Sequence, residues 1–279
     1  MSKIRSKWCS ARFHKLLNEG RGQGILKDYQ PFIQIHDIPS LGICSRIKST
    51  TVGRVHHLLS RNELNFFYLL DYDDDVTDIR EQYPLLDPGN LSDLTSIVKI
   101  AETMGIKYPR DPRSNYPYVM TSDFVVTRKD GTLVYSIKES EAFNNSRTRE
   151  LQEFERRYWE WRGISWQIVT ELEINTTRVR NIQWIYNSRD IESTFPDKEL
   201  RAEVMKFEMS LYEKTKDSIL KIAKETEHNF QLAGGSGLLF FQRLLFEKRL
   251  DFPIDQPLDL TAPRLTESNG DLACFSVFQ

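Results

Sequence analysis

Residues 120–126 read MTSDFVV, residues 133–138 read LVYSIK, and the stretch KDGT at 129–132 joins them. Two apolar runs around a short turn that contains Asp-Gly are typical of a β-hairpin. The first run carries an acid, Asp123, and the second ends on a base, Lys138. Two strands and a tight turn can span the fifteen positions between them and leave both side chains near one sheet edge. The hairpin therefore predicts an acid and a lysine close together in space.

A second acid, Glu63, lies upstream in the stretch SRNEL at 60–64, where we expect the first turn of a helix. Hydrolysis of a phosphodiester by water needs cations to offset developing negative charge, and carboxylates are the ligands that hold Mg²⁺ or Mn²⁺. A lysine beside two acids can orient or deprotonate the attacking water, or stabilise the transition state as a fixed positive charge. Glu63, Asp123 and Lys138 together therefore indicate the catalytic residues of a metal-dependent nuclease.

Each of the three residues also has a purely structural interpretation. Ser60 followed three positions later by Glu63 is a capping-box pattern, in which the acid serves the start of its own helix. Asp123 can be an acid on an edge strand, and Lys138 a solvated charge on a half-buried strand. On the pattern alone these alternatives stay open.

Several further stretches occur in an order that is typical of one protein family. They are GRGQG at 20–24, KDY at 27–29, TVGRVHHLLS at 51–60, DIREQYPL at 78–85, SDF at 122–124 and LQEFERRYW at 151–159. With them, roughly residues 20–186 resemble the TnsA endonuclease subunit of heteromeric, Tn7-like transposases.

The resemblance implies an α/β fold of the restriction-endonuclease-like, PD-(D/E)XK type, with a mixed sheet flanked by helices. We expect this catalytic domain at 1–172, with its residues 1–19 forming an N-terminal helical arm. A smaller, mainly helical, winged-helix-like domain is expected at 173–279, with a helix at 237–250 followed by an extended wing.

By the same resemblance, Glu63 and Asp123 supply the metal-binding carboxylates, and the Ile137 backbone carbonyl and waters complete the coordination. The cofactor is then Mg²⁺, with Mn²⁺ able to substitute, and two ions are expected. Ser136 stands where the family usually has an amide or a carboxylate two positions before the lysine. A hydroxyl is a poorer ligand, so Ser136 is expected to hold a water.

Glu81 and Glu155 are secondary candidates for the site, although acids flanked by arginines are more often ion-pair or surface residues. Arg54, His56 and His57 are expected to bind DNA. Adjacent histidines on a strand face opposite sides and cannot easily share one metal ion. A structural role for the two histidines is the alternative.

The resemblance implies cleavage at the 5′ ends of a transposon during cut-and-paste excision. The expected partners are double-stranded transposon-end DNA, an RNase H-like (TnsB-like) transposase and an AAA+ (TnsC-like) ATPase. A non-catalytic subunit that bridges transposase and ATPase is one alternative, favoured by Ser136. An autonomous restriction-type nuclease is another.

Composition is consistent with a soluble globular protein: 279 residues, 39% hydrophobic, with a formal net charge of −2. A near-neutral chain gives no global signal for DNA binding, so we expect partners to position it on DNA. Its cysteines form no C-x-x-C pair, which predicts reduced thiols in a bacterial cytoplasmic protein. The sequence has no membrane-length apolar run, no P-loop and no nucleophile elbow.

Other elements follow from periodicity and turn residues. Paired strands are expected at 31–35 and 43–47. Helices are expected at 91–104 and from 151 to about 163, and a strand at 165–169. Residues 199–228 predict two helices packed on each other.

Overall fold

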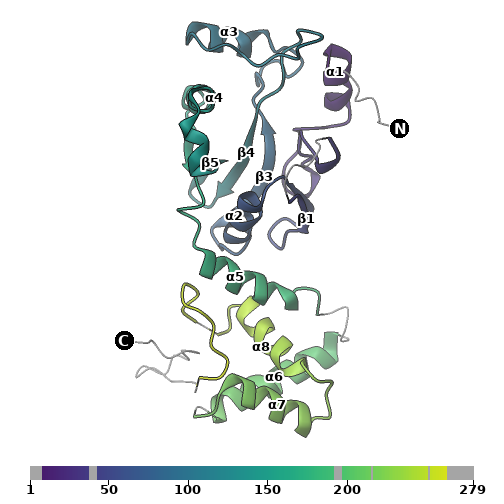
Figure 1. Cartoon of the computed structure of the whole chain (residues 1–279). Coiled ribbons are helices and arrows are strands. Elements are labelled where there is room, and N and C mark those ends of the chain that lie inside the picture. The colour runs from purple at the N-terminus through teal and green to yellow at the C-terminus, as the bar shows by residue number, and fades with distance from the viewer. Residues whose placement is uncertain (1–7, 38–42, 192–196, 215, 251, 263–279) are drawn as a thin grey trace, which may run out of the picture. The chain divides into compact units, whose positions relative to one another are not determined.

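The computed structural model in Figure 1 divides the chain into two compact units, residues 1–174 and 175–279, and each is described by itself. The break lies next to the domain boundary expected at 172/173. The structure describes residues 8–37, 43–191, 197–214, 216–250 and 252–262.

The first unit is built on a four-stranded mixed sheet with the order β3-β4-β5-β6. The first three strands pair antiparallel, and β6 runs parallel to β5. The bounds are β3 Val76–Pro84, β4 Thr121–Arg128, β5 Gly131–Ile137 and β6 Ser165–Val169. The predicted hairpin of β4 and β5 is confirmed, as is the strand at 165–169.

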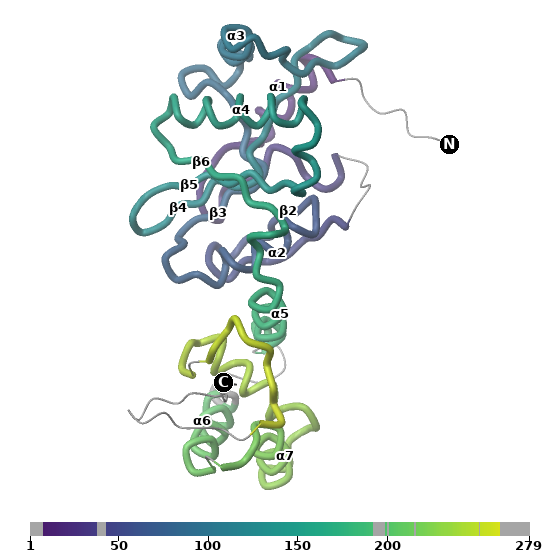
Figure 2. Tube along the Cα trace, turned by 60° about the vertical axis from the view of Figure 1, so that its left-hand side comes forward, coloured from purple at the N-terminus to yellow at the C-terminus, as the bar shows by residue number. Residues whose placement is uncertain are grey.

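Helices cover both faces of this sheet, and Figure 2 shows α4 on one side of the strands and α2 with β2 on the other. The helices of the sheet are α2 Arg61–Asp71, α3 Thr95–Thr103 and α4 Ser146–Trp161. The arrangement confirms the expected mixed sheet flanked by helices.

Alternate residues of the strands fill the two layers. On the α4 side, Val125 and Val134 lie in one core cluster with Phe154 and Tyr158. On the α2 side, Phe66 packs against Phe124 and Tyr135, with ring centroids 6.1 and 4.9 Å apart. The sheet is therefore buried on both faces, which fixes the register of the hairpin.

The chain before α2 forms α1 and a second, two-stranded sheet. Helix α1 (Ser10–Asn18) buries Phe13 and Leu16, and β1 (Ser45–Lys48) pairs antiparallel with β2 (Val55–Leu58). Two short 3₁₀ helices, η1 (Leu26–Asp28) and η2 (Ile35–Asp37), lie between α1 and β1.

The strand predicted at 31–35 is wrong. This segment runs as irregular chain along the outer side of β3, where the Phe32 amide donates to the Gln82 carbonyl at 3.2 Å. The Tyr29 hydroxyl likewise donates to the Glu81 carbonyl at 3.0 Å. Contacts with a distant strand therefore override the local apolar pattern.

The described residues of the second unit contain helices and no strand. The helices are α5 (Thr176–Ile185), α6 (Asp197–Glu213), α7 (Ile219–Asn229) and α8 (Ser236–Phe246), and the 3₁₀ helix η4 (Tyr186–Ser188) directly follows α5. The two helices predicted within 199–228 and the helix predicted at 237–250 are confirmed.

Helix α8 lies at the centre of this unit and buries Phe240, Phe241, Leu244 and Leu245. A β-carbon on Gly237 would lie 2.7 Å from the backbone of Ala223, so only glycine permits this crossing of α7 and α8. Residues 252–262, expected as a wing, contain turns and bends but no strand. The winged-helix detail therefore stays a prediction.

Among the described residues, none of the helices has the length and apolar character required to cross a membrane.

Candidate active site

The hairpin brings Asp123 and Lys138 into direct contact. The Lys138 Nζ lies 2.7 Å from the Asp123 Oδ2, and the same oxygen accepts the Ile137 amide hydrogen at 2.6 Å. The Ser136 hydroxyl donates to it more weakly at 3.4 Å. All three donors therefore hold one oxygen of Asp123 and leave Oδ1 outside these bonds.

Glu63 occupies the first turn of α2, and Ser60 caps that helix as the capping-box pattern predicts. Its amide donates to the Ser60 hydroxyl at 3.1 Å, which satisfies one of the unpaired donors at the helix start. Its side chain, however, turns inward and is 6% exposed. There Oε2 accepts from the Leu59 amide at 2.9 Å and from the Gln82 side-chain amide at 3.4 Å.

The carboxylates of Glu63 and Asp123 repel each other electrostatically. Burial, followed by repulsion from the Asp123 carboxylate, raises the pKa of Glu63 to about 7. A pair of buried acids that repel one another is the electrostatic setting in which a cation binds favourably.

The donor set suits a hard cation. The Leu59 and Gln82 amides both hold Oε2 of Glu63, so Oε1 is left outside these two bonds, as Oδ1 of Asp123 is left outside its three. The Ile137 carbonyl oxygen accepts a hydrogen bond from the Lys138 ammonium group at 3.0 Å, and the same ammonium group contacts Asp123. Mg²⁺ is usually held by one or two carboxylates with several waters, and these residues fit that requirement. Within the described ranges no group of three or more His, Cys, Asp or Glu side chains is arranged to hold a metal.

Lys138 carries its charge in this environment. Burial lowers the pKa of its ammonium group, but the carboxylates of Asp123, Glu155 and Glu63 outweigh burial and raise the pKa above its usual range. A lysine with a raised pKa is a poor base at neutral pH. The geometry therefore favours the fixed positive charge among the roles expected for Lys138.

Glu155 lies on α4 at the opposite side of the same charge cluster. It is 2% exposed, and it accepts from the Ser122 hydroxyl at 2.7 Å, which in turn accepts from the Trp159 indole at 2.8 Å. Burial raises the pKa of Glu155, Lys138 lowers it and Asp123 raises it again. The helix packed over the site thus contributes a buried acid that interacts with both hairpin residues.

Glu81 is tied into an ion-pair network. Its two oxygens accept from Arg54 at 2.9 and 2.5 Å, and His56 Nδ1 lies 2.8 Å away. Burial would raise the pKa of Glu81, but His56 and Arg54 hold it far below its usual value. The acid is therefore ionised and bonded to β2 and to the turn before it.

This network includes two of the three residues that were expected to bind DNA, Arg54 and His56. Arg54 and His56 are buried and engaged with Glu81, so in this structure they stabilise the link between β2 and β3. Their burial argues against direct contact with DNA. His57 faces the other way, as expected for adjacent strand residues, and is partly exposed. Its amide donates to Glu81 at 3.0 Å, and its Nδ1 accepts from the Ile35 amide at 3.3 Å.

Gln82 was not singled out from the sequence, yet its side chain contacts Glu63 and lies one residue from Glu81. No local pattern distinguishes it, because its position depends on a backbone angle that only the folded sheet imposes.

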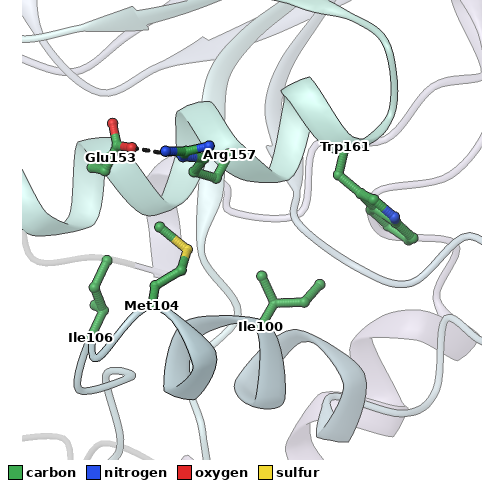
Figure 3. Close-up of a pocket in the computed structure, with 6 residues that line it drawn as sticks. All are labelled: Ile100, Met104, Ile106, Glu153, Arg157 and Trp161. Atoms are coloured by element: carbon green, nitrogen blue, oxygen red, sulfur yellow. Dashed lines mark hydrogen bonds and ion pairs between the residues drawn. The ribbon is translucent and has the colours of Figure 1, made fainter.

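A hollow of about 590 Å³ lies away from this cluster, between α3 and α4. Figure 3 shows its lining, in which Glu153 and Arg157 of α4 pair above the apolar side chains of α3 and of the turn that follows it. The lining residues are Ile100, Met104, Ile106, Glu153, Arg157 and Trp161. None of them belongs to the charge cluster around Asp123.

Two buried carboxylates beside an ammonium group, gathered on a mixed sheet with helices on both faces, define the class of the protein as a nuclease. Comparison with known proteins is more specific. A family model described as "TnsA-like endonuclease N terminal" matches residues 73–171, and one described as "TnsA endonuclease C terminal" matches residues 173–254.

The chain is 37% identical over 241 residues to "Transposon Tn7 transposition protein TnsA" of Escherichia coli. The match covers 85% of this chain and 84% of that relative. The chain therefore belongs to the TnsA family, and it is a DNA endonuclease subunit of a transposase. The resemblance inferred from the sequence is confirmed. Asp123 and Lys138 lie within the first family match, whereas Glu63 lies upstream of it.

Proposed function

We propose that the chain hydrolyses phosphodiester bonds at the 5′ ends of a transposon, with Mg²⁺ as cofactor and Glu63, Asp123 and Lys138 as the catalytic residues. The observation that carries the proposal is the convergence of α2 and the β4–β5 hairpin on one cluster, where Asp123 contacts Lys138 and repels Glu63.

Each residue has a role that follows from its contacts. Glu63 Oε1 and Asp123 Oδ1 would hold the cation, with the Ile137 carbonyl as a third oxygen. When bound, the cation offsets negative charge on the phosphate and lowers the pKa of the attacking water. The Ile137 amide keeps Asp123 in its rotamer. Lys138 supplies a positive charge to the pentavalent phosphorus.

Ser136 fits this proposal without serving as a ligand. It is fully buried and its hydroxyl contacts Asp123 at 3.4 Å, so it adds a weak donor where the family usually has an amide or an acid. Two ions would require more oxygen ligands than Glu63 and Asp123 supply, so waters or DNA phosphates would complete the second position. Mn²⁺ is expected to substitute for Mg²⁺.

The proposed partners are double-stranded transposon-end DNA, an RNase H-like transposase that makes the joining-strand cuts, and an AAA+ ATPase that recruits or activates both. The support is the likeness to a transposition protein of Tn7. The second unit, if it forms a winged helix, would contact DNA or one of these partners.

Strand-resolved cleavage tests the proposal. Transposon-end DNA labelled on each strand is incubated with Mg²⁺, the neighbouring transposase and ATPase, and either wild type, Asp123→Ala or Asp130→Ala. Asp130 is the matched control because it lies in the exposed turn of the same hairpin. We expect Asp123→Ala to lose the 5′ cuts by at least about 100-fold and to keep the joining-strand cuts, with Asp130→Ala like wild type.

Two outcomes would point to the alternatives. Unchanged 5′ cutting by Asp123→Ala would move the chemistry to another subunit and make this chain a bridging protein. Site-specific double-strand cutting by the chain alone would make it an autonomous nuclease.

A further inference from the structure

Gln82 has a backbone conformation that a strand residue rarely adopts. It lies inside β3 with φ +49°, in the left-handed region that favours glycine. Five described residues other than glycine have positive φ, and Gln82 is the one that is buried within a strand. Strain of this kind persists only where the surrounding structure imposes it, and it concentrates at functional sites.

The strained residue lies directly opposite Asp123. The register of β3 and β4 pairs Glu81 with Phe124 on one side of this point and Tyr83 with Ser122 on the other. Gln82 and Asp123 are therefore neighbours across the two strands.

In both β3 and β4, the side chains switch from one face of the sheet to the other at Gln82 and Asp123. Glu81 contacts His56, which packs on Phe67 of α2, whereas Tyr83, two residues later, packs on Trp159 of α4. Residues two apart in a regular strand share a face, so the alternation of β3 reverses at Gln82.

The partner strand reverses at the matching position. Ser122 bonds Trp159 and Glu155 of α4, whereas Phe124 packs on Phe66 of α2. Asp123 lies at this reversal, and the left-handed backbone of Gln82 faces it across the sheet.

The side chain of Gln82 completes a bridge between the elements of the site. Its Nε2 donates to Glu63 Oε2 at 3.4 Å, and its Oε1 accepts from the Thr121 hydroxyl at 2.9 Å. With the Leu59 amide on the same oxygen, Gln82 fixes the orientation of the Glu63 carboxylate by holding Oε2.

We propose that Gln82 is a positioning residue of the endonuclease: its amide holds Glu63 of α2 against β4, and its left-handed backbone sets the reversal at Asp123. The cation-binding geometry of the two acids then depends on a residue that is not itself a ligand. The inference rests on the proposed metal site of Glu63 and Asp123.

Two substitutions separate the side chain from the backbone. Gln82→Gly accepts positive φ without strain and removes the amide. Gln82→Asn also tolerates positive φ better than glutamine, but its amide is one methylene too short to bridge Thr121 and Glu63. The matched controls are Gln231→Gly and Gln231→Asn, because Gln231 is an exposed glutamine with φ +54° in the second unit.

The measurements are Mn²⁺ affinity by electron paramagnetic resonance, urea unfolding in EDTA, and single-turnover cleavage in the assembled system at rising Mn²⁺. We expect both Gln82 variants to unfold at wild-type or higher urea concentrations and to bind Mn²⁺ about 10- to 100-fold more weakly. Cleavage should recover part of its rate at high Mn²⁺. The Gln231 variants should bind and cleave as wild type.

Wild-type Mn²⁺ affinity in both Gln82 variants would overturn the positioning role while leaving the metal site intact. Weaker binding that tracks an equal loss of stability in both variants would also overturn it, because Gln82 would then serve the fold alone. If wild type and Asp123→Ala bind Mn²⁺ equally, the proposed metal site fails, and the role of Gln82 falls with it.

Discussion

The substitution Glu81→Gln should destabilise the first unit strongly. It keeps the volume of the side chain but removes a charge that is fully buried and bonded to Arg54 through both oxygens. The guanidinium would then stay buried without its counter-ion. Breaking a buried pair in this way costs roughly 3–5 kcal/mol, which lowers the midpoint of thermal unfolding by about 6–20 °C for a domain of this size.

Urea and thermal unfolding followed by tryptophan fluorescence would measure this cost, since four of the five tryptophans lie in residues 1–174. The matched control is Glu153→Gln on α4. Glu153 also pairs with two arginines, but its side chain is 43% exposed. Surface pairs of this kind contribute less than about 1 kcal/mol.

A loss for Glu81→Gln no larger than that of the control would refute the reasoning from burial. A variant that stays stable but loses cleavage would restore Glu81 as a catalytic candidate, as considered from the sequence.

Two further predictions concern the charges of the site. The pKa of Glu63 rises from 4.5 to about 7 on folding, so the folded state binds this proton more tightly and metal-free stability should fall by about 2–3 kcal/mol as pH rises through that window. Urea unfolding in EDTA at pH 5 and pH 8 should show the loss in wild type and not in Glu63→Gln; an equal loss in both would assign it to another group. Lys138→Gln removes the ammonium that competes with a cation for Asp123, so it should bind Mn²⁺ at least as tightly as wild type yet cleave roughly 100-fold more slowly. Weaker Mn²⁺ binding by this variant would contradict the competition.

The parts of the fold that local chemistry determines were predicted well. The β4–β5 hairpin follows from its Asp-Gly turn and apolar runs, and α4 ends where Gly163 takes a positive φ of 68°. The strand expected at 31–35 failed because its apolar side chains Phe32 and Ile33 pack in a cluster with Phe13 of α1. The amide of Phe32 finds its acceptor in Gln82, fifty residues away, and no local pattern encodes that distance.

The candidate site divides in the same way. Asp123 and Lys138 could be paired from the sequence because one turn joins their strands. The partner of Glu81 could not, since the adjacent Arg80 bonds Asp78 and the buried pair is made with Arg54. The sequence left two interpretations of Glu63, a role in capping its helix and a role in the site. In the structure the Glu63 backbone amide bonds to the Ser60 cap, while its carboxylate is buried near Asp123.

The candidate site combines residues of one β-hairpin with a residue of a helix that is distant in sequence. Asp123, Ile137 and Lys138 belong to one hairpin and bond to one another there, whereas Glu63 arrives with α2, which is held to the rest of the unit by tertiary contacts such as Phe66 on Tyr135 and Gln82 on Glu63. An opening that released only α2 would leave the hairpin pair neutralised and take away the second carboxylate. If Glu63 and Asp123 bind the cation as proposed, a chain in that state would lack one of its two carboxylate ligands and should not cut DNA. On the proposed site, cleavage by incompletely folded copies of the subunit would then be prevented by the way the two carboxylates are distributed between α2 and the hairpin.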